Sequence, residues 1–435
     1  MAVDTVIYMV GLLVLLVLLG FHIAVALAMT SVLGIYLMMG NFDIAVHLLG
    51  SAAYEAVRSQ TYIVIPLFIL MGDFVSKSGT ASDLYQACNR VLWRVSGRLA
   101  VATVAGNTIF SAVTGVSVAA AAAFSRIAYP EMRRLGYDRE YAVGVVAGSA
   151  CLGMLIPPSL LLIVWAILTE ASVGRLFLAG VVPGLFLAIL FSAYCIIRAW
   201  LKPEIAPNPP TGDAAQPLTS SQILGAVGVL ALVLLVIGGL WGGLFTPTEA
   251  AAFGTIGAMI LGIAKGMRHR EIMQAIYSAA RTTGPIMILL IAATMYSRLL
   301  AMSGAVNFIQ GIFLDLGNVF LIIGLITVIW IVLGLLIDSV SIILLTVPIF
   351  VPISMSIGLD QTAFAIFGVL VIEAGLLTPP FGLVVYAVKG SVPDREIKLS
   401  HIFRGAFPFC LILLLCAFLV LGFPQLSNWL PDFSR

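Results

Sequence analysis

The stretch Leu155–Ser159, which reads LIPPS, places two adjacent prolines inside a long apolar segment. The stretch Leu377–Phe381, which reads LTPPF, repeats this pattern in a second apolar segment. Proline breaks a helix because it lacks a backbone N–H and its ring collides with the preceding turn. The freed carbonyls and amides are costly in lipid unless the break lines a cavity inside the protein. The two stretches therefore predict two internal sites formed by broken helices.

The composition around these breaks is typical of a membrane protein. Of the 435 residues, 61% are hydrophobic and 10% are charged, whereas about a quarter of an ordinary soluble domain is charged. Apolar runs of about 20 residues, separated by short polar connections, predict an all-α polytopic membrane protein. Ten spans are expected, near residues 5–20, 22–40, 62–79, 139–168, 173–200, 221–241, 247–266, 284–302, 361–388 and 403–423.

Two further apolar stretches, 99–129 and 317–357, do not read as ordinary spans. Each is too long for one span and is interrupted by Ser, Gly and Pro residues. We predict that they form re-entrant hairpins, with tips at Thr114–Ser117 and Ile337–Ser341.

The remaining polar stretches predict how the chain lies in the membrane. The amphipathic stretches 42–60 and 268–281 are expected to lie along the membrane surface. A Pro-rich linker from Lys202 to Pro217 separates two nearly equal halves. Most of the 22 Lys and Arg residues fall on cytoplasmic segments if the N-terminus is periplasmic. The positive-inside rule therefore favours a periplasmic N-terminus.

The two halves repeat each other at a fixed offset. Gly136 and Asp138 recur as Gly358 and Asp360, and the two Pro-Pro pairs align with them. Because each half has five predicted spans, the second copy starts on the opposite side of the membrane. Inverted repeats with interrupted helices are typical of secondary transporters. The expected division is a first repeat 1–200 (hairpin 99–129, broken helix 139–168), a cytoplasmic linker 201–220, and a second repeat 221–435 (hairpin 317–357, broken helix 361–388).

The hairpin tips and the breaks offer oxygen ligands. Hydroxyl and carbonyl oxygens without thiolates suit a hard cation such as Na⁺, and the N-termini of half-helices suit an anionic substrate. We expect two or more Na⁺ sites and no organic cofactor. One predicted site comprises Asp338, Ser339, Ser341, Gly375 and Thr378, and the other comprises Thr114, Gly115, Ser117, Gly153 and Ile156.

The acids differ between these two sites. Asp338 lies in an apolar stretch, and a buried intramembrane carboxylate favours a functional role. Asp338 could instead form a structural salt bridge or cap a helix. The serines could instead donate hydrogen bonds to carbonyl groups of their own helices. Val116 occupies the position that matches Asp338, so the first site has no acid of its own. Glu373, the other acid expected to be buried, aligns with Cys151. A protonated and a paired carboxyl are the alternatives for Glu373, and the sequence assigns it no role.

An anionic substrate calls for a cationic partner. Arg298 is the basic residue that lies well inside a predicted span, and a guanidinium can hold a carboxylate through two parallel hydrogen bonds. Pairing with Asp338 and snorkelling to the outer surface are the alternatives for Arg298. The expected substrate-binding residues are Arg298, Asp338, Ser111, Asn107 and Ser159.

Several motifs in order make the sequence resemble the large membrane subunit of tripartite ATP-independent periplasmic (TRAP) transporters. The resemblance covers essentially the whole chain. It implies a Na⁺-driven importer of organic acids in the bacterial inner membrane, with a scaffold and a moving, elevator-type transport domain. It also implies two protein partners, a small membrane subunit and a periplasmic substrate-binding protein. The motifs are IPLFILMG (65–72), TGVSVAAAAAFSRIAYPEMRRLGYDREYA (114–142), GMLIPPS (153–159), LFLAGVVPG (176–184), GLFTPTEAAA (243–252) and GLLTPPFG (375–382).

Three other function classes are weighed against this one. A stand-alone divalent-anion/Na⁺ symporter of similar fold needs no partner proteins. An ion channel also uses paired hairpins, but two closed tips in inverted symmetry suit alternating access better. An enzyme is least favoured, because the sequence has no HExxH motif and no Gly-rich phosphate loop, and its four histidines lie apart. No nucleic-acid partner is expected, and the sequence does not name the substrate.

Overall fold

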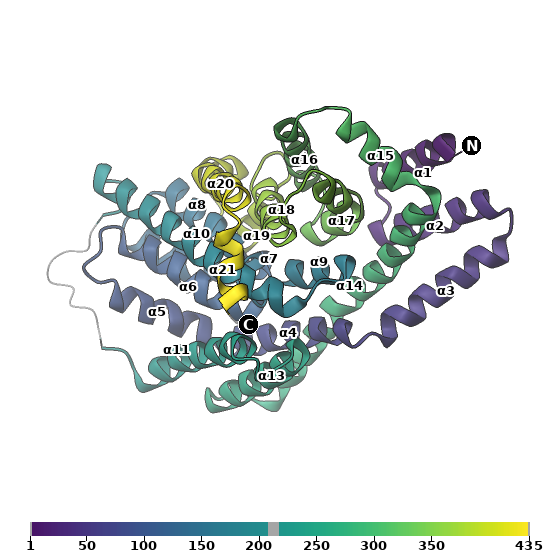
Figure 1. Ribbon diagram of the computed structural model, residues 1–435. Helices are drawn as coiled ribbons and strands as arrows, with labels where there is room; N and C mark the ends of the chain where they lie inside the picture. The colour runs from purple at the N-terminus through teal and green to yellow at the C-terminus, as the bar shows by residue number, and fades with distance from the viewer. Residues whose placement is uncertain (1, 208–216, 434–435) are drawn as a thin grey trace.

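The computed structural model describes residues 2–207 and 217–433, and these residues form helices without any β-strand. Figure 1 shows that α7, α9, α18 and α19 gather near the centre of the molecule. The first half contains α1 (Ala2–Leu18), α2 (Ile23–Met39), α3 (Phe42–Arg58), α4 (Gln60–Lys77), α5 (Thr80–Val91), α6 (Arg98–Thr114), α7 (Ser117–Arg134), α8 (Arg139–Ala150), the 3₁₀ helix η1 (Cys151–Met154), α9 (Leu160–Thr169) and α10 (Val173–Leu201).

The second half follows the linker, whose residues 208–216 lie outside the described part of the chain. It contains α11 (Ser220–Val233), the π-helix η2 (Leu234–Gly238), α12 (Gly239–Trp241), α13 (Pro247–Ala264), α14 (His269–Ser303), α15 (Ala305–Leu314), α16 (Val319–Gly334), α17 (Ser339–Ser356), α18 (Gln361–Gly375), α19 (Leu383–Ser391), α20 (Leu399–Gly422) and α21 (Gln425–Phe433).

The repeated Gly-x-Asp motif ends one helix and starts the next in both halves. Gly136 and Gly358 follow α7 and α17 with φ values of +81° and +75°, a region that glycine enters without a steric penalty. The Asp138 carboxylate accepts a hydrogen bond from the Tyr141 N–H at 2.9 Å, and Asp360 accepts one from Ala363 at 2.8 Å. These N-caps satisfy amides that the first turn of a helix leaves unpaired.

The helices lie where the sequence predicts hairpins and breaks. The first hairpin consists of α6 and α7, which meet at Gly115–Val116. The second consists of α16 and α17, which are joined by residues 335–338. The Pro-Pro pairs lie between α8–η1 and α9 and between α18 and α19, and both Pro-Pro bonds are cis.

The structure differs in detail from the prediction of ten spans, two of which, 139–168 and 361–388, were expected to be broken helices. Among the described residues, six helices are long and apolar enough to cross a membrane, or seven if the bent pair α3–α4 counts as one. The count differs because α1 and α2 have 17 residues each and the Pro-Pro breaks divide two predicted spans. Three short helices, α5, α15 and α21, were not expected from the sequence.

The two amphipathic stretches have different structures. The stretch 42–60 forms α3, which is joined to α4 at an angle of 58° through the extended residue Ser59. The expectation of a separate surface helix over 268–281 is wrong, because this stretch continues into the next predicted span as α14, a helix of 35 residues. At 1.5 Å per residue such a helix is about 52 Å long, which exceeds the roughly 30 Å hydrocarbon core of a bilayer.

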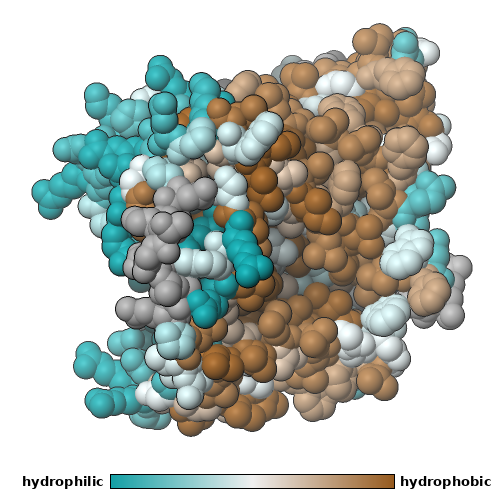
Figure 2. All heavy atoms as spheres, turned by 90° about the vertical axis from the view of Figure 1, so that its left-hand side faces the viewer, coloured by the Kyte–Doolittle hydropathy of each residue, from teal (hydrophilic) through white to brown (hydrophobic). Residues whose placement is uncertain are grey.

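The molecule has a buried centre and an apolar exterior. Every residue of α8 from Tyr141 to Ala150 is buried, as is every residue of α18 from Thr362 to Gly375. Large apolar side chains are nevertheless exposed, including Phe320 at 84%. Figure 2 shows hydrophobic residues over most of one face, with hydrophilic residues gathered along one side of it. A surface of this kind suits contact with lipid, and the chain is a multi-pass membrane protein.

Candidate cation and substrate site

The first hairpin tip packs directly on the first Pro-Pro break. The Leu160 N–H, at the start of α9, donates a hydrogen bond to the Gly115 carbonyl oxygen at 3.2 Å. Gly115 has a φ of +63°, and a Cβ on this residue would collide with the Pro158 carbonyl oxygen. A Cβ on Gly153 would lie 3.0 Å from the Ser117 nitrogen. The structure therefore brings the backbone of tip and break together.

A second helix closes over the same tip. A Cβ on Gly72 of α4 would lie 2.9 Å from the Cα of Thr114. The cavity that remains between α4, the tip and the break is about 10 Å³, and it is lined by Ile69, Val116 and their neighbours. The Thr114 hydroxyl donates to the Phe110 carbonyl, four residues earlier in α6, at 3.1 Å. This hydrogen bond to the helix's own backbone is the structural alternative to ion binding for a hydroxyl side chain.

Several buried oxygens near this tip have no hydrogen-bond partner among the described residues. They are Asn107 Oδ1, Ser111 Oγ and Ser117 Oγ on the hairpin, and both carboxylate oxygens of Glu373 on α18. Buried polar groups are normally hydrogen-bonded or coordinate a metal ion. Of these groups, the Ser117 hydroxyl lies beside the Glu373 carboxylate, and their oxygens fit a hard cation such as Na⁺.

Glu373 is the residue that the sequence left without a role. Its carboxylate lies against the Ser117 hydroxyl and the Cys151 thiol, and the Cys151 sulfur lies 3.9 Å from the Glu373 carbonyl oxygen. The alignment of Cys151 with Glu373 was the available signal, because the structure brings these two positions, 222 residues apart, into contact.

The second hairpin meets the second break through glycines. A Cβ on Gly334, at the end of α16, would lie 2.8 Å from the Cα of Gly375 at the end of α18. Ser339 and Ser341 are buried at the start of α17. The Thr378 hydroxyl donates to the Ala374 carbonyl, which belongs to the preceding helical turn, at 2.9 Å. The second tip thus reaches the second break through the backbone at the end of α16.

The expectation that Asp338 is buried is wrong. Asp338 is exposed, and it caps α17 by accepting from the Ser341 N–H at 3.0 Å and the Ser341 hydroxyl at 2.5 Å. The cap arises because Asp338 is the last extended residue before the helix. Capping does not test the predicted role of Asp338 in ion or substrate binding, which stays a prediction.

The weaker substrate candidates are buried beside the first tip. The Ser159 hydroxyl bridges the break, because it donates to the Met154 carbonyl and accepts from the Leu162 N–H at 3.3 Å. The Asn107 side-chain amide donates to the Ser149 hydroxyl at 2.6 Å. Asn107, Ser111 and Ser159 are fully buried, so contact with a substrate requires the first hairpin to move.

Arg298 lies in a different part of the molecule from these groups. Its guanidinium forms an ion pair with Glu55 of α3 and approaches the Ser51 hydroxyl at 3.4 Å. The side chains of Arg298 and Glu55 are 33% and 62% exposed. The structure does not bring Arg298 to Asp338, so the alternative of a pair with Asp338 is wrong. A contact between Arg298 and substrate stays a prediction.

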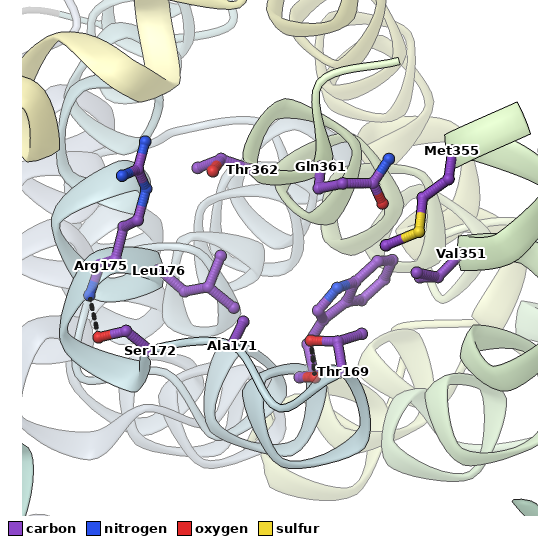
Figure 3. Close-up of a pocket in the computed structure, with 10 residues that line it drawn as sticks. Thr169, Ala171, Ser172, Arg175, Leu176, Val351, Met355, Gln361 and Thr362 are labelled. Carbon is purple, nitrogen blue, oxygen red and sulfur yellow. Dashed lines mark hydrogen bonds between the residues drawn. The ribbon is translucent and has the colours of Figure 1, made fainter. Parts of the chain in front are cut away.

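A separate cavity of about 110 Å³ lies between the α9–α10 and α17–α18 connections. Figure 3 shows side chains of the first connection opposite those of the second across this cavity. Arg175, at its edge, pairs with Asp432 of α21 at 3.1 Å. The residues that line this cavity include none of the predicted ion or substrate ligands.

The sequence matches one protein family over nearly its whole length. Residues 10–426 match the family described as the DctM component of tripartite ATP-independent periplasmic transporters. The C4-dicarboxylate TRAP transporter large permease DctM of Pseudomonas aeruginosa is 33% identical over 385 residues, which cover 87% of this chain and 88% of the relative. The ectoine TRAP transporter large permease TeaC of Halomonas elongata is 28% identical over 422 residues, which cover 96% and 97%. The sialic acid TRAP transporter large permease SiaM of Vibrio cholerae is 28% identical over 383 residues, which cover 86% and 87%.

Solved structures show the same fold at low identity. The YdaH transporter of Alcanivorax borkumensis has a TM-score of 0.62 at 14% identity, and the match covers 89% of each chain. MtrF of Neisseria gonorrhoeae has a TM-score of 0.58 at 14% identity, and the match covers 91% of this chain and 85% of MtrF. With its predicted motifs, its paired hairpins and breaks, and a family match over residues 10–426, the chain belongs to the large membrane subunits of TRAP transporters.

Proposed function

We propose that this chain imports an organic acid across the bacterial inner membrane as the Na⁺-coupled large subunit of a binding-protein-dependent TRAP transporter. The observation that carries the proposal is the contact between each hairpin and a broken helix, through Gly115 and Leu160 in one half and Gly334 and Gly375 in the other. Transporters form their substrate and ion sites where interrupted helices meet near the bilayer midplane.

The substrate class follows from charge and from the relatives. α7 and α9 both begin at the first tip and break, so two positive helix ends lie near each other. Helix N-termini bind carboxylates and other anions. The relatives are named for C4-dicarboxylates, ectoine and sialic acid, which all carry a carboxylate group. We therefore assign an organic carboxylate to this chain.

Bound Na⁺ would supply positive charge beside the anion. The residues proposed to hold Na⁺ are Thr114, Gly115, Ser117, Gly153 and Ile156 at one tip, and Asp338, Ser339, Ser341, Gly375 and Thr378 at the other. Both groups lie on the hairpins and broken helices, which we propose move together as the transport domain. The first spans, α3 and the amphipathic part of α14 belong to the fixed scaffold that holds the small subunit. In this proposal the two halves are inverted and the N-terminus is periplasmic.

Uptake in proteoliposomes tests the function. The purified large and small subunits are reconstituted, and the binding protein encoded beside them is added outside with its labelled ligand. We expect uptake when Na⁺ is higher outside and no uptake when choline replaces Na⁺. Equal uptake without any binding protein would instead establish the stand-alone symporter. Single-channel currents in the same membranes would establish a channel.

A further inference from the structure

Glu373 is a buried carboxylate without a cationic partner. Its side chain is in the last turn of α18, and the residue is 1% exposed. Within the described residues, neither carboxylate oxygen has a partner at normal hydrogen-bond geometry, although the Ser117 hydroxyl and the Cys151 thiol lie beside the carboxylate. No Lys or Arg among these residues forms an ion pair with it. An unpaired buried ion costs several kcal/mol, so this group requires a compensating charge or a proton.

Helix dipoles favour a cation at this position. Glu373 and Cys151 lie where α18 and α8–η1 end, and the C-terminal end of a helix carries a partial negative charge. α7 begins at Ser117 beside the carboxylate, but the stabilisation that a helix N-terminus gives a nearby anion is small compared with the cost of burying an unpaired ion. Because that contribution is smaller than the cost of the buried ion, the helix ends alone do not stabilise an ionised Glu373.

The oxygens around Glu373 fit the missing charge. The carboxylate lies against the Ser117 hydroxyl, whose oxygen also lacks a partner. Gly153 packs on the backbone of the same serine. Carboxylate, hydroxyl and carbonyl oxygens together are the ligands that a hard monovalent cation takes.

The two halves then supply their acids differently. The second tip has its own acid, Asp338, while Val116 occupies the matching position of the first tip. Glu373 comes from the second half, and its match in the first half is Cys151. A shared site accounts for this asymmetry, because the carboxylate absent from the first tip is provided by α18.

We propose that Glu373 is a ligand of the cation at the first hairpin tip, so that this Na⁺ site is built from both halves of the chain. The proposal rests on the Na⁺-coupled function given above. It adds a consequence: an ion bound in the first half also fixes the end of α18 beside the second break. Na⁺ at the first site therefore stabilises the arrangement of both breaks.

The test measures Na⁺ binding without transport. The purified complex with its small subunit is heated in detergent at several NaCl concentrations, with choline chloride keeping the ionic strength constant. In the wild type we expect the melting temperature to rise with Na⁺. In Glu373→Gln the Na⁺ concentration at half-effect should rise at least tenfold, while the melting temperature without Na⁺ stays equal or increases. Glu204→Gln, which alters an exposed acid of the linker, is the control with an unchanged midpoint.

Two other outcomes separate this proposal from the proposed function. In the first, the wild type responds to Na⁺ while Glu373→Gln has a Na⁺ midpoint within twofold of the wild-type midpoint. This result would overturn the proposed role of Glu373 alone, and it would mean that the Glu373 side chain is a protonated carboxyl that does not bind Na⁺. A wild type that does not respond to Na⁺ would overturn both proposals. If Glu373→Gln does not fold, Glu373→Asp keeps the charge and shortens the reach. Its midpoint should still shift by severalfold, and an unchanged midpoint would overturn the proposal.

Discussion

The two Pro-Pro breaks have nearly the same sequence, yet one is enclosed and the other is open. Cys151–Leu160 are all buried, whereas Pro379, Pro380 and Phe381 are exposed, the last to 53%. The tips differ in the same way at one matched pair, because Thr114 in the first is 8% exposed while Leu336 in the second is 53% exposed. The local sequence therefore determines that a break forms, and the neighbouring helices determine how accessible it is.

Glycines on the flanking helices account for the difference. A Cβ on Gly180 of α10 would lie 2.5 Å from the Leu155 carbonyl oxygen, so α10 approaches the first break closely. Gly405 on α20 stands three residues before Pro408, as Gly180 stands before Pro183, but it lies against Glu140 and Gly144 of α8. α20 therefore reaches the second break through side chains, with Phe403 against Gly382 and the Cys410 sulfur 3.6 Å from the Thr378 hydroxyl.

The largest expected effect comes from separating the enclosed tip from its break. In Gly115→Ala a Cβ at φ +63° adds about 1–2 kcal/mol of backbone strain and collides with the Pro158 carbonyl. We expect a marked fall in melting temperature and loss of uptake. Gly317→Ala is the matched control, because it has a φ of +64° and nothing within 4 Å of an added Cβ. Equal thermal losses in both variants would show that the contact of tip and break adds nothing to stability.

The open tip is tested by Asp338→Asn. Asparagine still caps a helix, so folding should change by less than about 1 kcal/mol. Loss of the charge should raise the Na⁺ concentration for half-maximal uptake about tenfold, which is about 1.4 kcal/mol. Uptake is measured in proteoliposomes over a range of Na⁺ concentrations. An unchanged Na⁺ dependence would leave Asp338 with the capping role alone.

The sequence predicted the hairpins and breaks because their signals are local. Gly-x-Asp ends and starts helices, and Pro-Pro interrupts them, wherever the chain goes afterwards. The Ser- and Gly-containing stretches predicted as tips lie where α6 gives way to α7, at Gly115, and where α17 begins, beside Asp338. The family was also predicted from local motifs, and three of the six lie at the first tip and at the two breaks.

The sequence failed where the outcome depends on packing. The exposure of Asp338 and the unpartnered state of Glu373 depend on which helices cover each tip, and no periodicity encodes that. The continuity of α14 was missed because an amphipathic stretch followed by an apolar one reads as two elements, and nothing local ends the helix between them. The ion pair of Arg298 joins residues 243 positions apart.

A smaller effect is expected for Arg298, which lies away from both breaks. If the role of Arg298 is the ion pair with Glu55, its side chain needs a positive charge but not the planar guanidinium that forms two parallel hydrogen bonds. We expect Arg298→Lys to retain most uptake, and Glu55→Gln to have a similarly small effect, because exposed pairs contribute about 0–1 kcal/mol. Loss of uptake in Arg298→Lys with normal uptake in Glu55→Gln would support the prediction that the Arg298 guanidinium binds the substrate carboxylate. Both variants are compared at equal reconstituted amounts.

The smallest effect concerns how each hairpin is anchored at its base. The first hairpin is tied to the other half, because the Tyr129 hydroxyl donates to Asp394 at 2.7 Å and Arg139 lies 3.4 Å from the same carboxylate. The second is tied within its own half, because the Ser354 hydroxyl donates to Gln361 at 3.1 Å. The Tyr129 hydrogen bond, aided by the charges of Arg139 and Arg133, holds the pKa of Asp394 below its usual value.

This anchoring should therefore depend on pH. A carboxylate whose pKa is lower in the folded state stabilises the fold above its unfolded pKa of about 3.9, and the contribution is lost as pH falls through the folded value. Asp394→Asn should melt on the order of 1 °C below the wild type near pH 7, because solvent screens a partly exposed carboxylate. The difference should shrink as pH falls below about 3.9 and disappear below the folded pKa of Asp394, where both proteins carry a neutral side chain at this position. Melting curves of the complex from pH 7 to pH 3 measure this, with Asp432→Asn as a control on a separate ion pair. A difference that stays constant as pH falls below about 3.9 would mean that the substitution disturbs packing, so that charge is not what ties the first hairpin to the second half.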